Sequence, residues 1–398
     1  MTAAPSSPPG VLAAPDAFKG TAGAPVIAEA IAAAAARAGW RCDLCPLSDG
    51  GEGFADVLAA GPGTARTGGR PRGRSFGRPG EWRRALVTGP LARPVTARWW
   101  MAGGDAVIES AAASGLPLAG GAEGNDPLGA TTRGTGELVV AALAAGARRV
   151  LIGVGGSATT DGGLGAIEAI EQAGGLGGAE VVVACDVAAR FVEAAEGFGP
   201  QKGATPAQVV ELRHRLEALA GTLRDRYGVD VRALPGSGAA GGLAGGLAAL
   251  GARLVPGFDL VADTVGLAAR LARADVVVTG EGRLDGSSWS GKVVGGVVRA
   301  AARVGVPVLV VAGAVGPGGV EGVSSAASGP SVAGPASGGT TSGGTTSGGT
   351  TSGGTVVEVV SLTDRCGPAR SLADPAGCVD EVVGAALAER RGPPLTIK

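Results

Sequence analysis

The sequence predicts an α/β fold with mostly parallel sheets that are covered by helices. The first observation is the alternation of short apolar runs with alanine-rich helical stretches along 398 residues, a length sufficient for two domains. The second is an interior of small and aliphatic side chains, since the chain is 45% hydrophobic but only 3% aromatic and holds 75 glycines. Apolar strands that alternate with helices are typical of parallel sheets.

The N-terminal part predicts two strand–helix units. Residues 10–14 are expected to form the first strand, which leads through PDAFKG to a helix over 24–37. A second strand near 41–46 leads through LSDGGEG to a helix near 54–58.

The rest of the chain repeats this alternation. Strands are predicted over 106–109, 149–153, 180–184, 275–279, 307–312 and 356–362. Helices are predicted from Gly163 onward, over 205–227 and 239–250, and near 293–304 and 378–390. The helix at 205 begins with a capping box, Thr205 and Gln208, and has proline as its first residue.

Three segments are expected to lie outside the packed core. Residues 1–10 read as a disordered N-terminus. The Arg-, Gly- and Pro-rich stretch 66–84 reads as a surface loop or a disordered insert. The SGGTT repeats predict a flexible Gly/Ser/Thr-rich loop over 334–355, because this composition buries too little apolar surface to fold.

Composition argues against several classes of protein. The net charge is −1 and no sustained basic face with interleaved aromatic residues occurs, so nucleic acid is not an expected partner. The N-terminus lacks the pattern of a signal peptide, and no run of about 18 apolar residues is free of glycine or charge. We therefore expect a cytoplasmic protein without a membrane span. The five cysteines form an odd, sparse set that indicates reduced thiols.

The single histidine restricts the chemistry. His214 lies between Arg213 and Arg215 on the predicted helix 205–227, where we expect it to face solvent. Ser-His-Asp hydrolysis, Cys-His proteolysis and a His-ligated zinc site are therefore not expected. Any chemistry falls to carboxylates, lysines, hydroxyl groups and the backbone.

Lysine is confined to a few loops. Of 34 basic residues four are lysine, and one of them, Lys398, ends the chain. Lys19, Lys202 and Lys292 each adjoin a glycine in a polar loop. Because arginine supplies the other basic residues, these three positions indicate sites that need a compact ammonium group, such as phosphate- or carboxylate-binding sites. Chance placement is the alternative explanation.

Carboxylates follow several of the predicted strands. The candidates are Asp16, Asp49, Glu52, Asp161, Asp186, Glu281 and Asp285. Parallel sheets bind ligands at the carboxyl ends of their strands. One or two such carboxylates could hold Mg²⁺ through oxygen, and one could act as a base. For any one residue alone, a helix cap or an Asx turn explains its position equally well.

Two glycine-rich segments, GVGGSATTDGG and PGSGAAGG, precede helices and predict anion binding by backbone N–H groups. GSGAAG at 236–241 matches the dinucleotide pattern G-x-G-x-x-G, a weak signal in a chain with so much glycine. GSSWSGK at 286–292 resembles the start of a P-loop, but valine follows the lysine where Ser or Thr would bind Mg²⁺. We therefore reject a Walker A loop.

Eight blocks, in order along most of the chain, resemble the type 1 glycerate kinases. They are APDAFKG, PLSDGGEGF, AVIESAAASGLPL, ATTRGTGEL, IGVGGSATTDGG, FGPQKGAT, PGSGAAGGL and VVTGEGRLDGSSWSGKV. Eight ordered blocks make a specific resemblance, unlike any single glycine motif. The resemblance implies Mg²⁺-dependent transfer of the γ-phosphoryl group of ATP to D-glycerate, which gives 2- or 3-phosphoglycerate.

The resemblance also implies an architecture. A Rossmann- or flavodoxin-like parallel-sheet domain would comprise residues 11–90 and 273–398. A second α/β domain, 91–272, would be inserted into it, with the site in the cleft between them. ATP and D-glycerate are the expected small-molecule partners, and the oligomeric state stays open between a monomer and a homodimer.

The resemblance and the residue chemistry together suggest roles. Asp186 is the expected base that orients the attacking hydroxyl, with Asp16 and Asp49 as rivals, and Lys19 joins the catalytic set. Asp161 and Asp285 are the expected Mg²⁺ ligands. The expected substrate- and phosphate-binding residues are Ser48, Asp49, Gly50, Gly51, Gly156, Ser157, Thr159, Thr160, Lys202, Gly238, Glu281, Arg283 and Lys292. In this set Lys202 and Lys292 would neutralise anionic groups, and Arg283 could clamp the glycerate carboxylate.

One segment departs from the family pattern. From Cys185 onward the chain reads CDVAARFVEAAEGFGPQKGA, which is shorter than usual and lacks the Asn-Pro of the family's glycine-rich loop. Two alternatives therefore stay open: a nucleotide-binding oxidoreductase that uses GSGAAG, and a non-catalytic, ligand-binding relative of the kinases.

Overall fold

The protein is described by a computed structural model. The described residues are 8–60, 74–75, 78–323, 347–352 and 355–391. They form two compact units. The first comprises the described parts of Met1–Ser48 and Ala262–Lys398, and the second those of Asp49–Gly61 and Gly68–Val261.

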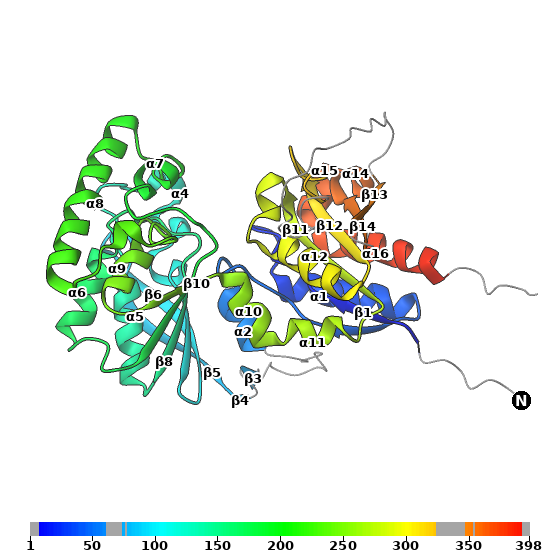
Figure 1. The fold of residues 1–398 in the computed structure, drawn as a ribbon, viewed down its shortest axis with the longest axis horizontal. Coiled ribbons are helices and arrows are strands. Elements are labelled where there is room, and N and C mark those ends of the chain that lie inside the picture. Colours follow the sequence, from blue (N-terminus) through cyan, green and yellow to red (C-terminus); the bar gives the residue numbers. More distant parts are fainter. Residues whose placement is uncertain (1–7, 61–73, 76–77, 324–346, 353–354, 392–398) are drawn as a thin grey trace, which may run out of the picture. The chain divides into compact units, whose positions relative to one another are not determined.

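The first unit is built on a six-stranded sheet in the order β13-β14-β12-β11-β1-β2 (Figure 1). All neighbouring strands are parallel except β13, which runs antiparallel to β14. The strands are β1 (Gly10–Ala13), β2 (Arg41–Leu44), β11 (Val276–Leu284), β12 (Val308–Val315), β13 (Ser347–Ser352) and β14 (Thr355–Ser361). The helices are α1 (Ala24–Arg37), α11 (Leu267–Leu271), η4 (Gly286–Trp289), α12 (Val293–Val304), α14 (Leu362–Cys366), α15 (Pro368–Ala373) and α16 (Pro375–Arg391).

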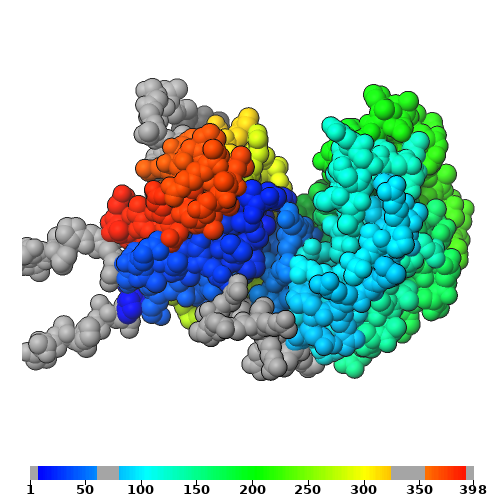
Figure 2. Space-filling view, turned by 180° about the vertical axis from the view of Figure 1, so that it is seen from behind, coloured from blue at the N-terminus to red at the C-terminus, as the bar shows by residue number. Residues whose placement is uncertain are grey.

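Helices α1 and α16 pack together against this sheet. Ile31 of α1 and Leu387 of α16 share a buried cluster with Val278 of β11. Burying each such aliphatic side chain stabilises the fold by about 1.5–3 kcal/mol. The space-filling view shows α16 in red beside the N-terminal segments in blue (Figure 2), and Arg37 and Asp380 form an ion pair of 2.6 Å across these two helices.

The direction of strand succession reverses between β1 and β11. The connection through α1 places β2 on one side of β1, whereas β12 and β14 follow β11 on the other side. In open α/β sheets this reversal opens a crevice at the carboxyl ends of the two strands, where ligands bind. The carboxyl ends of β1 and β11 are therefore the first place to look for a site in this unit.

The second unit is built on a six-stranded sheet in the order β10-β9-β8-β7-β6-β5. Strands β7 to β10 are parallel, and β5 and β6 form an antiparallel extension. The strands are β5 (Glu81–Thr88), β6 (Pro94–Ala102), β7 (Asp105–Glu109), β8 (Arg149–Gly153), β9 (Glu180–Ala184) and β10 (Arg253–Val255). A separate hairpin pairs β3 (Arg74–Ser75) with β4 (Arg78–Pro79).

The helices of the second unit range from single turns to a helix of 22 residues. They are α2 (Phe54–Ala60), α3 (Ala111–Ser114), η1 (Leu116–Ala119), α4 (Gly121–Gly124), α5 (Arg133–Ala144), α6 (Leu164–Gln172), α7 (Ala194–Phe198), η2 (Pro200–Lys202), α8 (Pro206–Tyr227), η3 (Val231–Ala233) and α9 (Leu243–Ala249). Helix α10 (Gly257–Val265) begins in the second unit and ends in the first.

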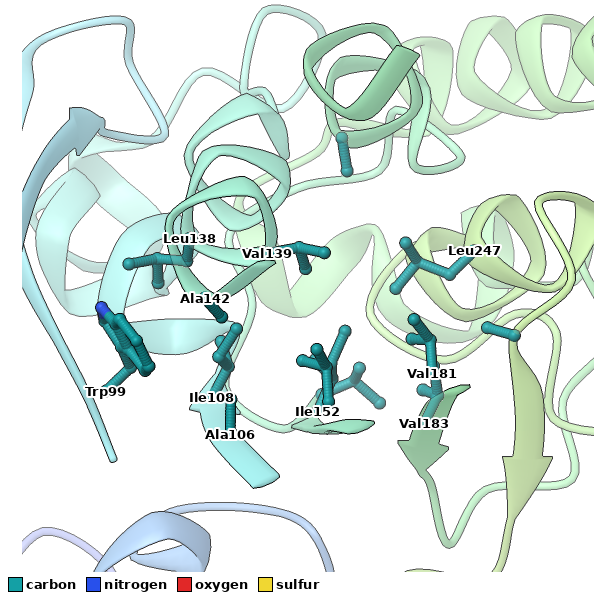
Figure 3. Packing of buried hydrophobic residues seen from close by; sticks show 14 of the residues in the cluster. Trp99, Ala106, Ile108, Leu138, Val139, Ala142, Ile152, Val181, Val183 and Leu247 are labelled. Atoms are coloured by element: carbon teal, nitrogen blue, oxygen red, sulfur yellow. The ribbon is translucent and has the colours of Figure 1, made fainter. Parts of the chain in front are cut away.

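Figure 3 shows the main core of the second unit. Ile108, Ile152 and Val183 point from three adjacent strands toward Leu138 of α5 and Leu247 of α9. These positions alternate along their strands with residues of the opposite sheet face, as the two-residue period of a strand requires. The glycines of α9 complete the packing, because a Cβ on Gly246 would lie 2.5 Å from the carbonyl oxygen of Gly162.

The predicted fold class, two α/β domains with largely parallel sheets, is confirmed. The two units divide the chain at positions other than the predicted boundaries at 90 and 273. Strand β5 pairs with β6, so residues 81–88 belong to the second sheet. At the other end, the Arg270 side chain of α11 bonds to Asp43 and to the carbonyl oxygen of Leu44 in β2.

Two predicted loops contain strands. The prediction of a surface loop or disordered insert over 66–84 is wrong for 74–75, 78–79 and 81–84, which lie in β3, β4 and β5, while 66–73 and 76–77 fall outside the described residues. Of the predicted loop 334–355, residues 347–352 form β13, and 334–346 and 353–354 are not among the described residues. Residues 1–7 of the predicted disordered N-terminus also fall outside them. None of the described helices has the length and apolar character needed to traverse a bilayer.

Candidate active site

In the first unit, the predicted residues gather at the reversal point between β1 and β11. The turn after β1 is fixed by main-chain bonds from Ala14 N to Val278 O and from Asp16 N to Gly280 O, at 2.8 and 2.9 Å. Asp16 is buried, and its Oδ1 accepts a bond from the Ala17 N–H at 2.7 Å. Lys19, three residues further on, is exposed.

A half-buried carboxyl group lies in the second half of β11. The Oε1 atom of Glu281 is buried and has no hydrogen-bond partner among the described residues. Burial raises the pKa of Glu281, whereas a hydrogen bond from Ser288 and the positive charges of Lys292 and Lys19 act in the opposite direction. One acid and two amines therefore lie within electrostatic reach of each other at this edge of the sheet.

Hydrogen bonds within the loop after β11 hold Lys292 at the start of α12. Asp285 Oδ1 accepts bonds from the N–H and the hydroxyl of Ser287 at 2.9 and 2.6 Å, which lower the pKa of Asp285. The Lys292 ammonium donates to the Ser287 hydroxyl at 2.7 Å, and Lys292 is the N-cap residue of α12. An ammonium group beside the N-terminus of a twelve-residue helix is a favourable setting for an anion. Arg283, on the same strand end, is exposed.

In the second unit, the loop over 154–163 follows β8 and is held on several sides. Ala158 N donates to Ser114 O at 2.9 Å, and Leu116 N donates to Gly156 O at 2.9 Å. Gly156 is exposed and has a φ of +71°, a conformation that favours glycine.

Thr159 and Thr160, in the same loop, are buried and their hydroxyls lack partners among the described residues. A buried hydroxyl without a partner is costly, so these two groups are candidates for ligand contacts.

Lys202 differs from the expectation that its ammonium is offered to a phosphate. It is only 4% exposed, and Nζ donates to Ser157 Oγ at 2.9 Å and to Thr159 O at 2.6 Å. Burial lowers the pKa of Lys202 to about 7, and the negative charge of Asp161 opposes this shift. The side chain thus contacts the loop over 154–163.

Asp161 does not fit the predicted role of a Mg²⁺ ligand. Its carboxylate accepts from the N–H and hydroxyl of Thr132, both at 2.8 Å, and from the N–H groups of Gly163 and Gly165 at 3.0 and 3.3 Å. Burial raises the pKa of Asp161 and these four bonds oppose the shift. The residue ties the start of α6 to the residue that precedes α5, and four donors already occupy its oxygen atoms.

Asp186, the expected base, lies at the N-terminus of α10. Its Oδ1 accepts from Gly257 N at 2.6 Å and its Oδ2 from Phe258 N at 3.1 Å. Burial raises the pKa of Asp186 to about 7, and the negative charge of Asp49 adds to this effect. A carboxyl group with a pKa near neutrality is suited to exchange a proton with a substrate hydroxyl.

The residues around Asp49 explain why this loop is rich in glycine. Asp49 Oδ1 accepts from Gly51 N at 3.0 Å. A Cβ on Gly50 would lie 2.7 Å from Ala184 O, and a Cβ on Gly257 would lie 2.1 Å from Asp49 O. Glycine at 50 and 257 therefore allows Asp49, the end of β9 and the start of α10 to approach. Ser48, next to this loop, is buried in the first unit.

GSGAAG supports the loop over 154–163. Gly241 O accepts from Gly162 N at 3.0 Å, and a Cβ on Gly241 would lie 1.9 Å from Thr159 O. Gly238 packs in the same close manner, because a Cβ there would lie 2.3 Å from Arg190 O. The segment follows the short helix η3, whereas a dinucleotide fingerprint follows a strand. The geometry therefore does not favour the oxidoreductase alternative.

Mg²⁺ binding requires oxygen ligands that converge on one point. Within the described ranges, no group of three or more His, Cys, Asp or Glu residues could hold a metal ion. Mg²⁺ commonly uses one or two carboxylates and completes its shell with water and substrate phosphates. The partnerless Oε1 of Glu281 fits such a minimal ligand set, and Asp285 lies four residues away in sequence.

The fold and these clusters define a two-unit α/β enzyme whose sheets present amines, carboxylates and hydroxyls at the carboxyl ends of their strands. The sequence model of the "Glycerate kinase family" matches residues 11–174 and 171–329. The chain belongs to the glycerate kinase family, which confirms the resemblance seen in the sequence, and it is a kinase that acts on an alcohol group.

Individual relatives agree with this assignment. The chain is 37% identical over 344 residues to the "Glycerate 2-kinase" of Escherichia coli K12, with 76% of this chain and 84% of that protein covered. It is 38% identical over 341 residues to the "Glycerate kinase" of Bacillus subtilis 168, with 77% and 85% covered. A crystal structure of a Salmonella typhimurium LT2 protein assigned as glycerate kinase 2 matches with a TM-score of 0.70 and 30% identity, over 96% of this chain and 98% of that one.

Proposed function

We propose that this protein transfers the γ-phosphoryl group of ATP to D-glycerate in the cytoplasm, in a Mg²⁺-dependent reaction that gives 2- or 3-phosphoglycerate. The observation that carries the proposal is the family match, because it includes both the reversal-point residues of the first unit and the loops of the second. The proposed substrates are small molecules.

The proposal gives the charged groups of the first unit an anion-binding role. Phosphoryl transfer needs little covalent help from a protein and depends on positioning and on compensation of negative charge. Lys19, Lys292 and Arg283 supply positive charge, and the N-terminus of α12 adds backbone donors. Mg²⁺ held with the help of Glu281 or Asp285 would neutralise phosphate charge when it is bound.

The second unit supplies the groups that act on the acceptor. Asp186 accepts the proton of the attacking hydroxyl, a role that its raised pKa of about 7 supports. Ser157, Thr159 and Thr160 donate hydrogen bonds to anionic substrate oxygens, which the buried and partnerless hydroxyls of the two threonines support.

The experiment is a measurement of ADP release with D-glycerate, with L-glycerate and without acceptor, with and without Mg²⁺. The proposal expects ADP release that requires D-glycerate and Mg²⁺. Release that is independent of the acceptor, or absent, would contradict it. Tight ATP or glycerate binding without turnover would instead favour the non-catalytic relative.

A further inference from the structure

The side-chain amine of Lys202 lies within hydrogen-bond distance of the Ser157 hydroxyl. Its Nζ lies 2.9 Å from Ser157 Oγ and 2.6 Å from Thr159 O. Both side chains are largely buried, at 4% exposure for Lys202 and 7% for Ser157. Asp161 is the charged residue whose field acts on this amine among the residues that the structure describes.

The side chain of Asn125 holds together the two backbone segments that carry this contact. Asn125 Nδ2 donates to Ala158 O and to Lys202 O, each at 2.9 Å. One amide therefore joins the backbone of the loop over 154–163 to the backbone of residue 202. Ala158 lies between the two residues to which Nζ donates, so the amine and its acceptors are fixed relative to each other.

The chemistry of the donor sets the role of the hydroxyl. A protonated lysine carries three donors and no acceptor, so Ser157 Oγ accepts in this contact whenever Lys202 is protonated. The single hydroxyl proton of Ser157 is then directed away from Lys202 and is available for another acceptor. The adjoining Gly156 is exposed, which leaves this part of the loop accessible.

We propose that protonated Lys202 is a positioning residue that holds Ser157 as a hydrogen-bond donor to an anionic oxygen of a substrate. This inference rests on the proposed function. It replaces the expectation that Lys202 itself contacts a phosphate. The anionic oxygen belongs to a nucleotide phosphate or to the carboxylate of the hydroxy acid, two sources with the same acceptor chemistry.

A double-mutant cycle tests whether Lys202 acts through Ser157. The variants are Lys202→Met, which removes the amine at similar side-chain length, Ser157→Ala, and the two together. Loss of one hydrogen bond to a charged ligand raises KM by about tenfold. If Lys202 acts only through Ser157, the double variant shows the same rise as Ser157→Ala alone, because the two changes remove one interaction.

The outcome that overturns the inference is additivity. If Lys202 contacts the substrate itself, the double variant shows the product of the two single effects, about a hundredfold. KM is measured separately for ATP and for D-glycerate, and the one that Ser157→Ala raises identifies the source of the anionic oxygen. Ser371→Ala is the matched control, since Ser371 is also a buried serine, and its hydroxyl donates to Pro368 O at 3.0 Å within the first unit.

A measurement without turnover keeps the inference separate from the proposed function. With four lysines in the chain, ¹³Cε-lysine NMR resolves each amine and its titration. We expect one amine to titrate near pH 7 in the wild type, and its pKa to fall in Ser157→Ala because the ammonium loses an acceptor. The same lysine pKa in the wild type and in Ser157→Ala would refute the contact. If the pKa falls in Ser157→Ala but the wild type has no kinase activity, only the proposed function is refuted.

Discussion

Substitution of Asp186 by Asn separates the chemistry of this residue from its structural contact. The carboxylate caps α10 by accepting from Gly257 N at 2.6 Å and from Phe258 N at 3.1 Å. Asn is as good a helix N-cap as Asp and keeps one acceptor oxygen, so we expect the cap to survive. The amide cannot accept a proton from the substrate hydroxyl, so the proposed base is lost.

The substitution is expected to change two quantities, kcat and the pH dependence of stability. A general base contributes about 10²- to 10⁴-fold, so we expect kcat to fall by at least about a hundredfold. The pKa of Asp186 rises from 3.8 to about 7 on folding, so the folded state binds the proton more tightly than the unfolded state. Wild-type stability therefore falls as pH rises from about 4 to about 7, by up to about 4 kcal/mol. Asp186→Asn removes this penalty and is expected to be more stable than the wild type at pH 8.

The assay combines steady-state ADP release with urea denaturation at pH 5 and pH 8. We expect low kcat with equal or higher stability at pH 8, and loss of the limb of the wild-type pH profile in which kcat/KM falls below pH 7. A damaged fold would lower both activity and stability. A kcat within threefold of the wild type would remove Asp186 from the chemistry and refute the reasoning.

Three further predictions concern the loops and a helix. Asp161→Ala leaves three backbone N–H groups without their acceptor, so the free energy of unfolding measured with urea is expected to fall by about 3 kcal/mol or more. A stable variant whose activity depends less on Mg²⁺ would instead support the role of Asp161 as a metal ligand. Gly241→Ala is expected to yield little folded protein, as judged by circular dichroism, because φ is +67° and the new Cβ would lie 1.9 Å from Thr159 O. Gly221→Ala in α8 is the contrasting change: its Cβ would have nothing within 4 Å, so the free energy of unfolding should rise by about 0.5–1 kcal/mol. Thr205→Ala breaks the capping box of α8 and should lower the free energy of unfolding by about 1 kcal/mol without changing KM; a change in KM would contradict its purely structural role.

The predicted strands and helices that carry strong local signals are found close to their expected places. The capping box at Thr205 marks the start of α8, and the apolar run near 275–279 lies in β11. Strand β5 escapes prediction because EWRRALVT carries three charged residues and forms the outermost strand of its sheet, where side chains stay accessible. Local composition therefore suggests a loop where pairing with β6 makes a strand.

The candidate site could be predicted only as a set of residues. The sequence singles out Lys202 and Asp161 by type and by their glycine-rich surroundings. It could not reveal that Lys202 faces Ser157, 45 positions away, or that Asp161 accepts from Thr132, 29 positions away. Burial and hydrogen-bond partners depend on such long-range contacts. The helix cap that Asp186 provides to residue 257 was hidden for the same reason.

The identity of the phosphorylated product tests the central claim most directly. ³¹P NMR of a reaction that contains ATP, D-glycerate, Mg²⁺ and the enzyme follows every phosphate at once. We expect the γ-phosphate signal of ATP to be replaced by a phosphomonoester signal that coincides with 2- or 3-phosphoglycerate. Inorganic phosphate as the sole new signal, or an unchanged ATP spectrum, would contradict the assignment of this chain as a glycerate kinase.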